Sequence, residues 1–147
     1  MTAKKLIKTK ATGTKAPKDA PQLFRLNLEV GDLKSAIAFY TKLLGVRGRK
    51  QAGSRCYFET GPVTLQVVDV SASHAPQPTP KALYFTVKNL EAVHARAKDL
   101  NCFLDGAVHD ELAGDIVVRP WGELSFYIQD RWRNPLCFVE AGTVYAG

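Results

Sequence analysis

The sequence predicts an α+β fold of two tandem βαβββ modules, which form a curved mixed sheet with helices on its outer face and a concave pocket on the other. Three observations support this prediction. A strand-like stretch, an amphipathic helix and three more strand-like stretches follow one another, and this order occurs twice. Asp32 and Asn89, at the two helix starts, are 57 residues apart. Leu43 and Leu100, near the helix ends, have the same separation.

The first module is expected over residues 22–70. Apolar and polar residues alternate over Leu26–Val30, as in a strand that is covered on one face only. Asp32 is the expected N-cap of the following helix, and Gly45 is expected to end it. Three further strands are predicted near 46–51, 54–60 and 63–69.

The second module is expected over residues 81–142, after a proline-rich linker over 71–80. Apolar residues alternate again over Leu83–Val87, and Asn89 takes the N-cap position of a second amphipathic helix. Three further strands are predicted near 115–120, 123–129 and 135–140.

Charge and composition divide the 147 residues into a tail over 1–21 and one domain over 22–147. Of the net charge of +6, residues 1–22 carry +5, so the basic character belongs to the tail. The tail has few large apolar residues, and we expect it to be flexible. We find no apolar run long enough for a transmembrane helix and no secretory signal, so no membrane association is expected. Three widely spaced cysteines favour reduced thiols and a cytoplasmic protein.

The polar residues of the alternating strands are expected to line the concave face, while Leu28, Phe85, Leu124, Phe126 and Ile128 face the helices. A concave wall with a few polar groups suits a small-molecule site. The candidate ligand-binding residues are Arg25, Asn27, Gln66, Tyr84, Trp121, Tyr127 and Cys137. Ser125 and Gln129 are expected on the same face. No catalytic constellation is evident, and Cys137 lacks an identifiable base that would make it a nucleophile.

Two phrases resemble the vicinal oxygen chelate superfamily, which includes glyoxalase I, bleomycin-resistance proteins, fosfomycin-resistance enzymes and extradiol dioxygenases. Val30-Gly-Asp-Leu-Lys-Ser-Ala-Ile-Ala-Phe-Tyr-Thr-Lys-Leu-Leu-Gly45 is similar to the family pattern V-x-D-x-x-x-x-x-x-F-Y-x-x-x-L-G. Arg119-Pro-Trp-Gly-Glu-Leu-Ser-Phe-Tyr-Ile-Gln-Asp130 is similar to W-G-x-x-x-F-x-x-x-D, and Asn134-Pro135-Leu136 resembles the start of the last strand. The resemblance spans about residues 22–142.

The resemblance implies metal ligands on four strands. The matching positions here are Arg25, Gln66, Ala82 and Cys137, so none carries His, Asp or Glu. The positive charge of Arg25 would repel a divalent ion by about 8 kcal/mol at ~4 Å and an effective dielectric constant of ~20. The histidines offer no replacement, because His74 lies in the linker, His94 on the second helix and His109 in a connector. We therefore expect no metal and no other cofactor.

These expectations predict a metal-independent small-molecule-binding protein of the glyoxalase/bleomycin-resistance type, which forms a homodimer and sequesters an anionic or aromatic compound. Arg25 is its expected anchor, because a guanidinium binds carboxylates well. The alternative for Arg25 is an ion pair with Glu29 or Glu59. One alternative function is a metal-dependent lyase or dioxygenase of the same superfamily. The other is nucleic-acid association through the Lys-rich tail, which we do not favour because the tail lacks aromatic residues and arginine.

The segment Asp130-Arg-Trp-Arg-Asn134 departs from the family's D-P-x-G-N. Arg133 replaces a turn glycine, so a left-handed backbone there would cost roughly 1–2 kcal/mol unless the turn is reshaped. Arg131, Trp132 and Arg133 are expected to be exposed together, where they shape the cavity mouth, form a dimer contact or simply face solvent.

Overall fold

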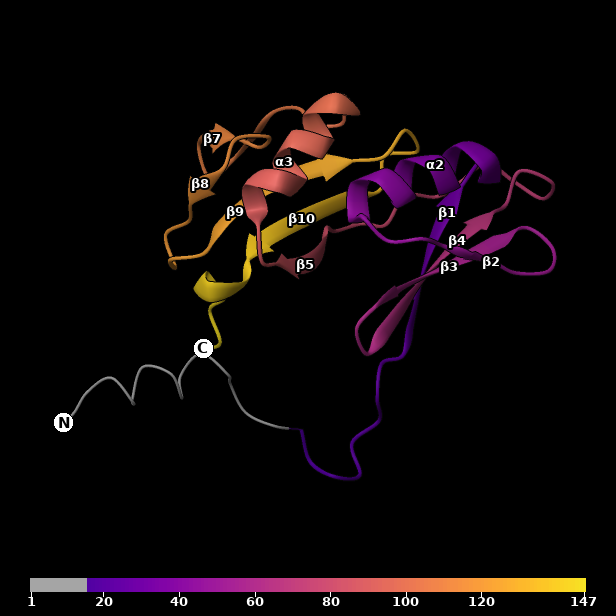
Figure 1. The fold of residues 1–147 in the computed structure, drawn as a ribbon, viewed down its shortest axis with the longest axis horizontal. Helices are drawn as coiled ribbons and strands as arrows, with labels where there is room; N and C mark the ends of the chain where they lie inside the picture. The colour runs from indigo at the N-terminus through magenta and orange to yellow at the C-terminus, as the bar shows by residue number, and fades with distance from the viewer. Residues whose placement is uncertain (1–15) are drawn as a thin grey trace.

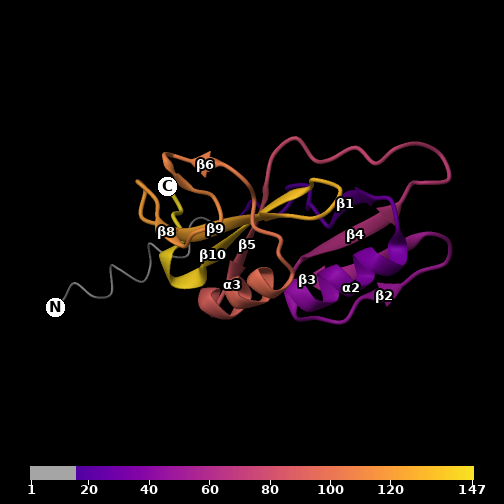
Figure 2. The same cartoon turned by 90° about the horizontal axis from the view of Figure 1, so that it is seen from above.

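A computed structural model describes residues 16–147 of the chain. In this part the chain forms two four-stranded mixed sheets, each with one helix, in the predicted α+β arrangement. The helices lie on the same side of the molecule, and the two modules lie side by side along its long axis (Figures 1 and 2). The predicted flexible tail falls mainly on residues 1–15, outside the described residues.

The first module consists of β1 (Arg25–Val30), α2 (Leu33–Leu44), β2 (Arg49–Lys50), β3 (Arg55–Thr60) and β4 (Val63–Asp69). Its strand order is β1-β4-β3-β2. β1 runs parallel to β4, with Asn27 opposite Gln66, while the other pairs are antiparallel. Gly45 ends α2 in the left-handed conformation at φ 71°. This conformation favours glycine and confirms the predicted helix end.

The second module consists of β5 (Leu83–Val87), α3 (Leu90–Asp99), β8 (Val117–Val118), β9 (Leu124–Gln129) and β10 (Pro135–Glu140), followed by the short 3-10 helix η1 (Ala141–Thr143). Its strand order, β5-β10-β9-β8, repeats that of the first module. β5 is parallel to β10, with Phe85 opposite Phe138. The proline-rich linker between the modules runs along one side of the molecule (Figure 2).

Two parts of the strand prediction need correction. The strands expected near 46–51 and 115–120 shrink to the two-residue strands β2 and β8. A small hairpin of β6 (Ala107–Val108) and β7 (Glu111–Leu112), which the sequence did not predict, interrupts the connection after α3. Each of these strands is too short to produce a measurable alternation of apolar and polar residues.

The last residue of β4 and the last residue of β10 stabilise the two helix starts in the same way. Asp69 Oδ2 accepts a hydrogen bond from Leu33 N at 3.0 Å, and Glu140 Oε1 accepts one from Leu90 N at 3.2 Å. Asn89 caps α3 as predicted, whereas the Asp32 side chain makes no capping hydrogen bond. Asp32 holds the predicted N-cap position of α2, and the carboxylate of Asp69, rather than the Asp32 side chain, satisfies the first helical N–H.

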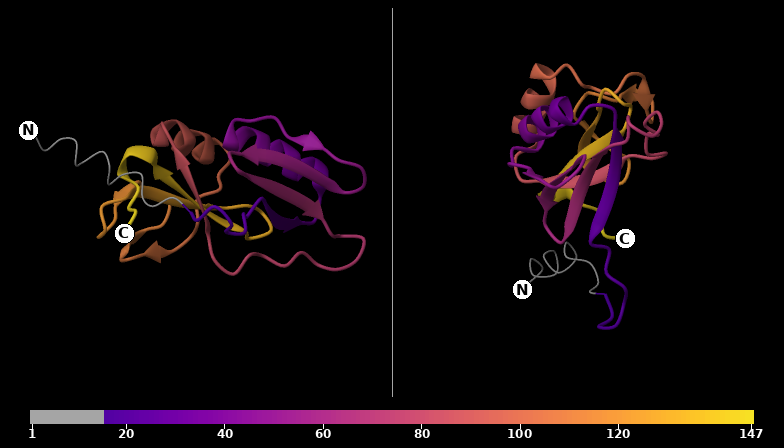
Figure 3. Two further views of the ribbon diagram at one scale, coloured as in Figure 1. Left: turned by 90° about the horizontal axis from the view of Figure 1, so that it is seen from below. Right: turned by 90° about the vertical axis from the view of Figure 1, so that its right-hand side faces the viewer.

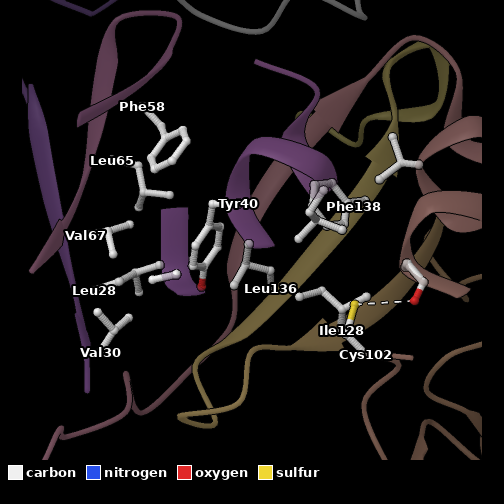
Figure 4. Packing of buried hydrophobic residues seen from close by; sticks show 14 of the residues in the cluster. Leu28, Val30, Tyr40, Phe58, Leu65, Val67, Cys102, Ile128, Leu136 and Phe138 are labelled. Carbon is white, nitrogen blue, oxygen red and sulfur yellow. Dashed lines mark hydrogen bonds between the residues drawn. The ribbon is translucent and has the colours of Figure 1, made fainter. Parts of the chain in front are cut away.

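The main core lies between the sheets and the helices. Leu28, Phe126 and Ile128 are buried there, with Phe85 and Leu124 partly buried against them, as predicted. Tyr40 of α2 lies between side chains of both modules, near Leu65 on one side and Leu136 on the other (Figure 4). Figure 3 shows the helices together on one side of the sheets. This common core joins the modules.

The turn between β9 and β10 of the second module packs against the first module and forms a hydrogen bond with it. Asn134 Nδ2 donates to the Glu29 carbonyl oxygen at 2.9 Å. Trp132 is half-buried against Gly31, where an added Cβ would lie 2.8 Å from its Nε1 atom. The expectation that Trp132 is exposed together with Arg131 and Arg133 is therefore wrong, because its ring packs on the first module. Arg133 has φ 69°, so the left-handed conformation is kept without glycine.

Candidate functional site

The polar face of the first module carries an arginine–aromatic cluster. The guanidinium carbon of Arg25 lies 5.3 Å from the ring centroid of Tyr57 and 4.9 Å from that of Phe24. Arg49 approaches the same Tyr57 ring at 5.6 Å. Cations over aromatic faces attract the ring quadrupole, so Tyr57 helps to hold both guanidinium groups in place.

Arg25 forms neither of the ion pairs that the sequence left open. The carboxylate of Glu59 pairs with Arg49, and that of Glu29 lies 3.3 Å from His74 Nε2. Arg25 is exposed, and among residues 16–147 no acidic side chain lies within salt-bridge distance of it. Its charge is therefore available to an anion on this face.

Gln66 lies beside this cluster with one unsatisfied polar atom. Its Nε2 donates to Asn27 Oδ1 at 2.9 Å, and only 7% of the residue is exposed. Its Oε1 atom is buried and has no hydrogen-bond partner. An unpaired buried acceptor costs about 1–3 kcal/mol, so a donor that reaches Gln66 would be favoured.

In the second module, the corresponding face is largely covered. Ser125 and Tyr127 are buried, and Cys137 has no exposed surface. Ala113, Leu104 and Val108 pack over Tyr127, Cys137 and Val139, because the segment around β6 and β7 folds across this face. Burial raises the pKa of the Cys137 thiol to about 11, so the thiol is protonated and a poor nucleophile.

Two aromatic residues of the second module stay open to solvent. Tyr84 is 60% exposed, and its hydroxyl lies 3.0 Å from that of Tyr127. Trp121 is 38% exposed and donates from Nε1 to Glu123 Oε1 at 2.8 Å. Tyr84 and Trp121 line a shallow cavity of about 350 Å³ together with Val139. Gln129 is half-buried at the end of β9.

Arg119 belongs to this second group, although sequence reasoning passed over it. It is 2% exposed, and it donates to Ser125 Oγ at 2.9 Å and to the Ser125 carbonyl oxygen at 3.2 Å. Its guanidinium carbon lies 5.3 Å from the Tyr127 ring centroid. The sequence does hold a signal for this role, because Arg119 is a charged residue in the connection between the antiparallel strands β8 and β9, six positions before Ser125.

The structure therefore brings the candidate residues together in two groups. Arg25, Asn27 and Gln66 form one group, while Tyr84, Trp121, Tyr127 and Cys137 form the other. Among the described residues, no hydrogen bond or aromatic contact links the two groups.

The four strand positions that would hold a metal do not fit one. Arg25 and Gln66 lie in the first module, and Ala82 and Cys137 in the second. A guanidinium, an amide, a methyl group and a protonated thiol supply too few anionic or imidazole donors for a divalent ion. Nowhere in residues 16–147 do three His, Cys, Asp or Glu side chains gather in a geometry that could hold a metal ion.

His94 and His109 make packing contacts within the second module. His94 Nε2 lies 2.9 Å from the Gly114 carbonyl oxygen, and its ring packs against Phe103 and Phe126. His109 lies against Trp121, with 5.1 Å between the ring centroids.

Within the described residues, none of the helices is both long and apolar enough to cross a bilayer.

Comparisons with known proteins agree with this architecture. The model of the Glyoxalase/Bleomycin resistance protein/Dioxygenase superfamily matches residues 22–138. No curated protein sequence matches the chain. Among solved structures, the chain is similar to a glyoxalase-related enzyme from Fulvimarina pelagi, with a TM-score of 0.62, 18% identity, and coverage of 82% of this chain and 88% of that chain.

Two further structures share the fold. The chain is similar to lactoylglutathione lyase from Agrobacterium tumefaciens, with a TM-score of 0.57, 22% identity, and coverage of 85% of this chain and 97% of that chain. It is also similar to a bleomycin-binding protein complexed with bleomycin, with a TM-score of 0.59, 15% identity, and coverage of 82% and 98%. At these identities the likeness concerns the fold. The repeated modules and the match over residues 22–138 place the chain in the Glyoxalase/Bleomycin resistance protein/Dioxygenase superfamily.

Proposed function

We propose that the protein binds a small aromatic anion on the polar face of its first module, without a metal. The observation that carries this proposal is the position of Arg25. Its guanidinium lies over Tyr57 at a strand position where the family resemblance implies a metal ligand, and it has no carboxylate partner among the described residues. A cation at that position attracts an anion through the same Coulomb interaction that repels a metal ion.

The neighbouring groups define the ligand chemistry. A guanidinium binds a carboxylate through two parallel hydrogen bonds. Phe24 and Tyr57 offer aromatic surface to a ring, and Phe24 is 60% exposed. Asn27 is two residues from Arg25 on β1, a separation of about 7 Å along the strand, and Asn27 contacts Gln66. A ligand whose hydrogen-bond donor lies about 7 Å from its anionic group could therefore contact Arg25 and also satisfy Gln66 Oε1.

In this proposal, the candidate residues of the second module have a supporting role. Tyr84 and Trp121 are exposed enough to form an aromatic wall, whereas Tyr127 and Cys137 lie buried beneath them. The hydrogen bond between the Tyr84 and Tyr127 hydroxyl groups fixes the Tyr84 ring. The homodimer, the cytoplasmic location and the role of the Lys-rich tail stay predictions.

The experiment uses 1-naphthoate as the probe and follows backbone amide shifts by NMR in the full chain. Shifts are expected at Arg25, Asn27 and Tyr57. Arg25→Gln should weaken binding about tenfold, which corresponds to the loss of one charge-assisted interaction of about 1.4 kcal/mol. Lys34→Gln, which removes an equal charge on the helical side of the sheet, should leave binding unchanged. Equal affinity in the Arg25→Gln variant would refute the proposed anchor.

A further inference from the structure

The duplicated modules meet at two pseudo-equivalent junctions. At the first, the β9–β10 turn of the second module lies against Gly31, between β1 and α2 of the first. At the second, the β3–β4 turn of the first module lies opposite β5 and α3 of the second, with Pro62 and Val63 facing the same space as Val87. The two junctions differ in how they are filled.

The first junction is closed and the second is open. Trp132 and Asn134 fill the first, through the contacts described above. The corresponding turn at the second junction, Thr60-Gly61-Pro62-Val63, carries no large side chain. Within residues 16–147, no hydrogen bond joins this turn to β5 or α3. A cavity of about 500 Å³ remains there, which is within the range of small-molecule sites.

The walls of this intermodule cavity are mainly apolar. Leu26, Leu43 and Leu65 come from the first module, and Phe85 and Phe138 from the second. Large apolar side chains are also exposed at its border, where Leu23 is 63% and Tyr84 is 60% exposed. Exposed apolar residues that gather around a cavity typically mark a binding site rather than ordinary surface.

Arg96 of α3 gives the cavity a positive charge. Its Nε donates to the Leu43 carbonyl oxygen at 3.2 Å, at the end of α2. Among the described residues, no carboxylate lies within salt-bridge distance of its guanidinium. Glu59 also lines the cavity, but its carboxylate is already bound by Arg49 and by Thr64 Oγ1. The walls therefore combine apolar surface with one cation that has no acidic partner.

We propose that this cavity binds an amphipathic anion, in which an apolar chain or ring system enters between the modules and an anionic group contacts Arg96. The anchoring cation differs from that of the site proposed around Arg25, although Tyr84 borders this cavity as well. Leu26 lines the cavity, whereas Arg25, its neighbour on β1, belongs to the opposite face of the sheet. The two sites therefore use opposite faces of the same strand.

The test measures the binding of decanoate and of decanol, its uncharged counterpart, to the full chain by titration calorimetry. Arg96→Gln should weaken decanoate binding about tenfold and leave decanol binding unchanged. Lys98→Gln, an exposed charge on the same helix, should change neither. Arg25→Gln should also leave decanoate binding unchanged, which separates this proposal from the first. A parallel loss of both ligands in Arg96→Gln would overturn the role of Arg96.

A second measurement keeps the proposal testable if a variant fails to fold. In the unmodified chain, decanoate should shift the amide signals of Val46, Val63 and Val87, which line the cavity. Val63→Trp should fill the cavity and abolish the binding of both decanoate and decanol. No decanoate binding to the unmodified chain, or shifts confined to other residues, would overturn the proposal. So would a dimer that Val63→Trp converts to a monomer, because the cavity would then be an interface between copies.

Discussion

The Tyr40 hydroxyl on α2 donates to Asp130 Oδ2 at 2.6 Å, so a buried hydrogen bond joins the first module to the second. The Asp130 carboxylate also accepts from the backbone N–H groups of Trp132 and Asn134 and from Asn134 Nδ2. Burial and the negative charge of Asp130 hold the pKa of Tyr40 well above its ordinary value, so its hydroxyl stays a donor. This bond organises the turn that closes the first junction.

Tyr40→Phe should lower the free energy of unfolding by about 1–3 kcal/mol, because one oxygen of a buried carboxylate loses a donor. Urea denaturation measures the change. Tyr145→Phe removes the same hydroxyl from an exposed residue, and it should change stability by less than about 0.5 kcal/mol. Similar small changes in both variants would show that the bond does not stabilise the modules.

Arg133→Gly should raise the stability by up to about 1 kcal/mol. Arg133 has φ 69°, a conformation in which a side chain is strained, and glycine relieves that strain at some cost in unfolded-state entropy. Arg131→Gly, in the same turn but without a positive φ, should destabilise the chain instead. Thermal unfolding of both variants compares them, and destabilisation by Arg133→Gly would contradict the assignment of strain.

All three cysteines should react slowly with a thiol reagent in the folded protein. Cys56, Cys102 and Cys137 are buried and free. Burial raises the pKa of Cys102 to about 11, as it does for Cys137, so few thiolates exist at about pH 8. Unfolding in urea should expose all three to rapid labelling. Rapid labelling of Cys137 before unfolding would show that the segment over the second module opens readily.

Lowering the pH should reduce the stability of the fold, in part through protonation of Asp69. Hydrogen bonds from the Ser71 side chain and backbone, and from Leu33 N, lower the pKa of Asp69 below its ordinary value. The pKa of Asp69 is lower in the folded protein than in the unfolded chain. Its ionised carboxylate therefore stabilises the fold fully at pH values above the unfolded pKa, and this stabilisation is lost as the pH falls through the folded pKa. Asp69→Asn should therefore lose less stability than the unmodified chain between about pH 6 and about pH 3. Urea denaturation at each pH measures the two stabilities, and an equal loss in both proteins would contradict the role of Asp69.

The sequence was most informative where a pattern repeats. Amphipathic patterns predicted both helices, the separation of 57 residues between Asp32 and Asn89 predicted the duplication, and period-two alternation predicted the long strands. The hairpin β6–β7 escaped prediction because two-residue strands have no period. The stabilisation of the helix starts by Asp69 and Glu140 depends on partners 36 and 50 residues away, which no local pattern indicates.

The candidate site was predictable in its residue types but not in its grouping. Alternation along β1 and β4 placed Arg25, Asn27 and Gln66 on one face, because neighbouring parallel strands share a register. The segment that covers Cys137 was not evident, since Leu104, Val108 and Ala113 of the connection after α3 pack in the same cluster, and no local pattern indicates this contact. Arg119 was missed because its partner atoms belong to Ser125 and Val108 on other elements.

An anion, rather than a metal ion, is proposed to bind at the position of Arg25. The most direct measurement is 1-naphthoate affinity before and after treatment with EDTA, together with the metal content of the purified protein. We expect equal affinities and no stoichiometric divalent metal. Loss of binding after EDTA treatment, with recovery when a divalent ion is added back, would contradict the claim.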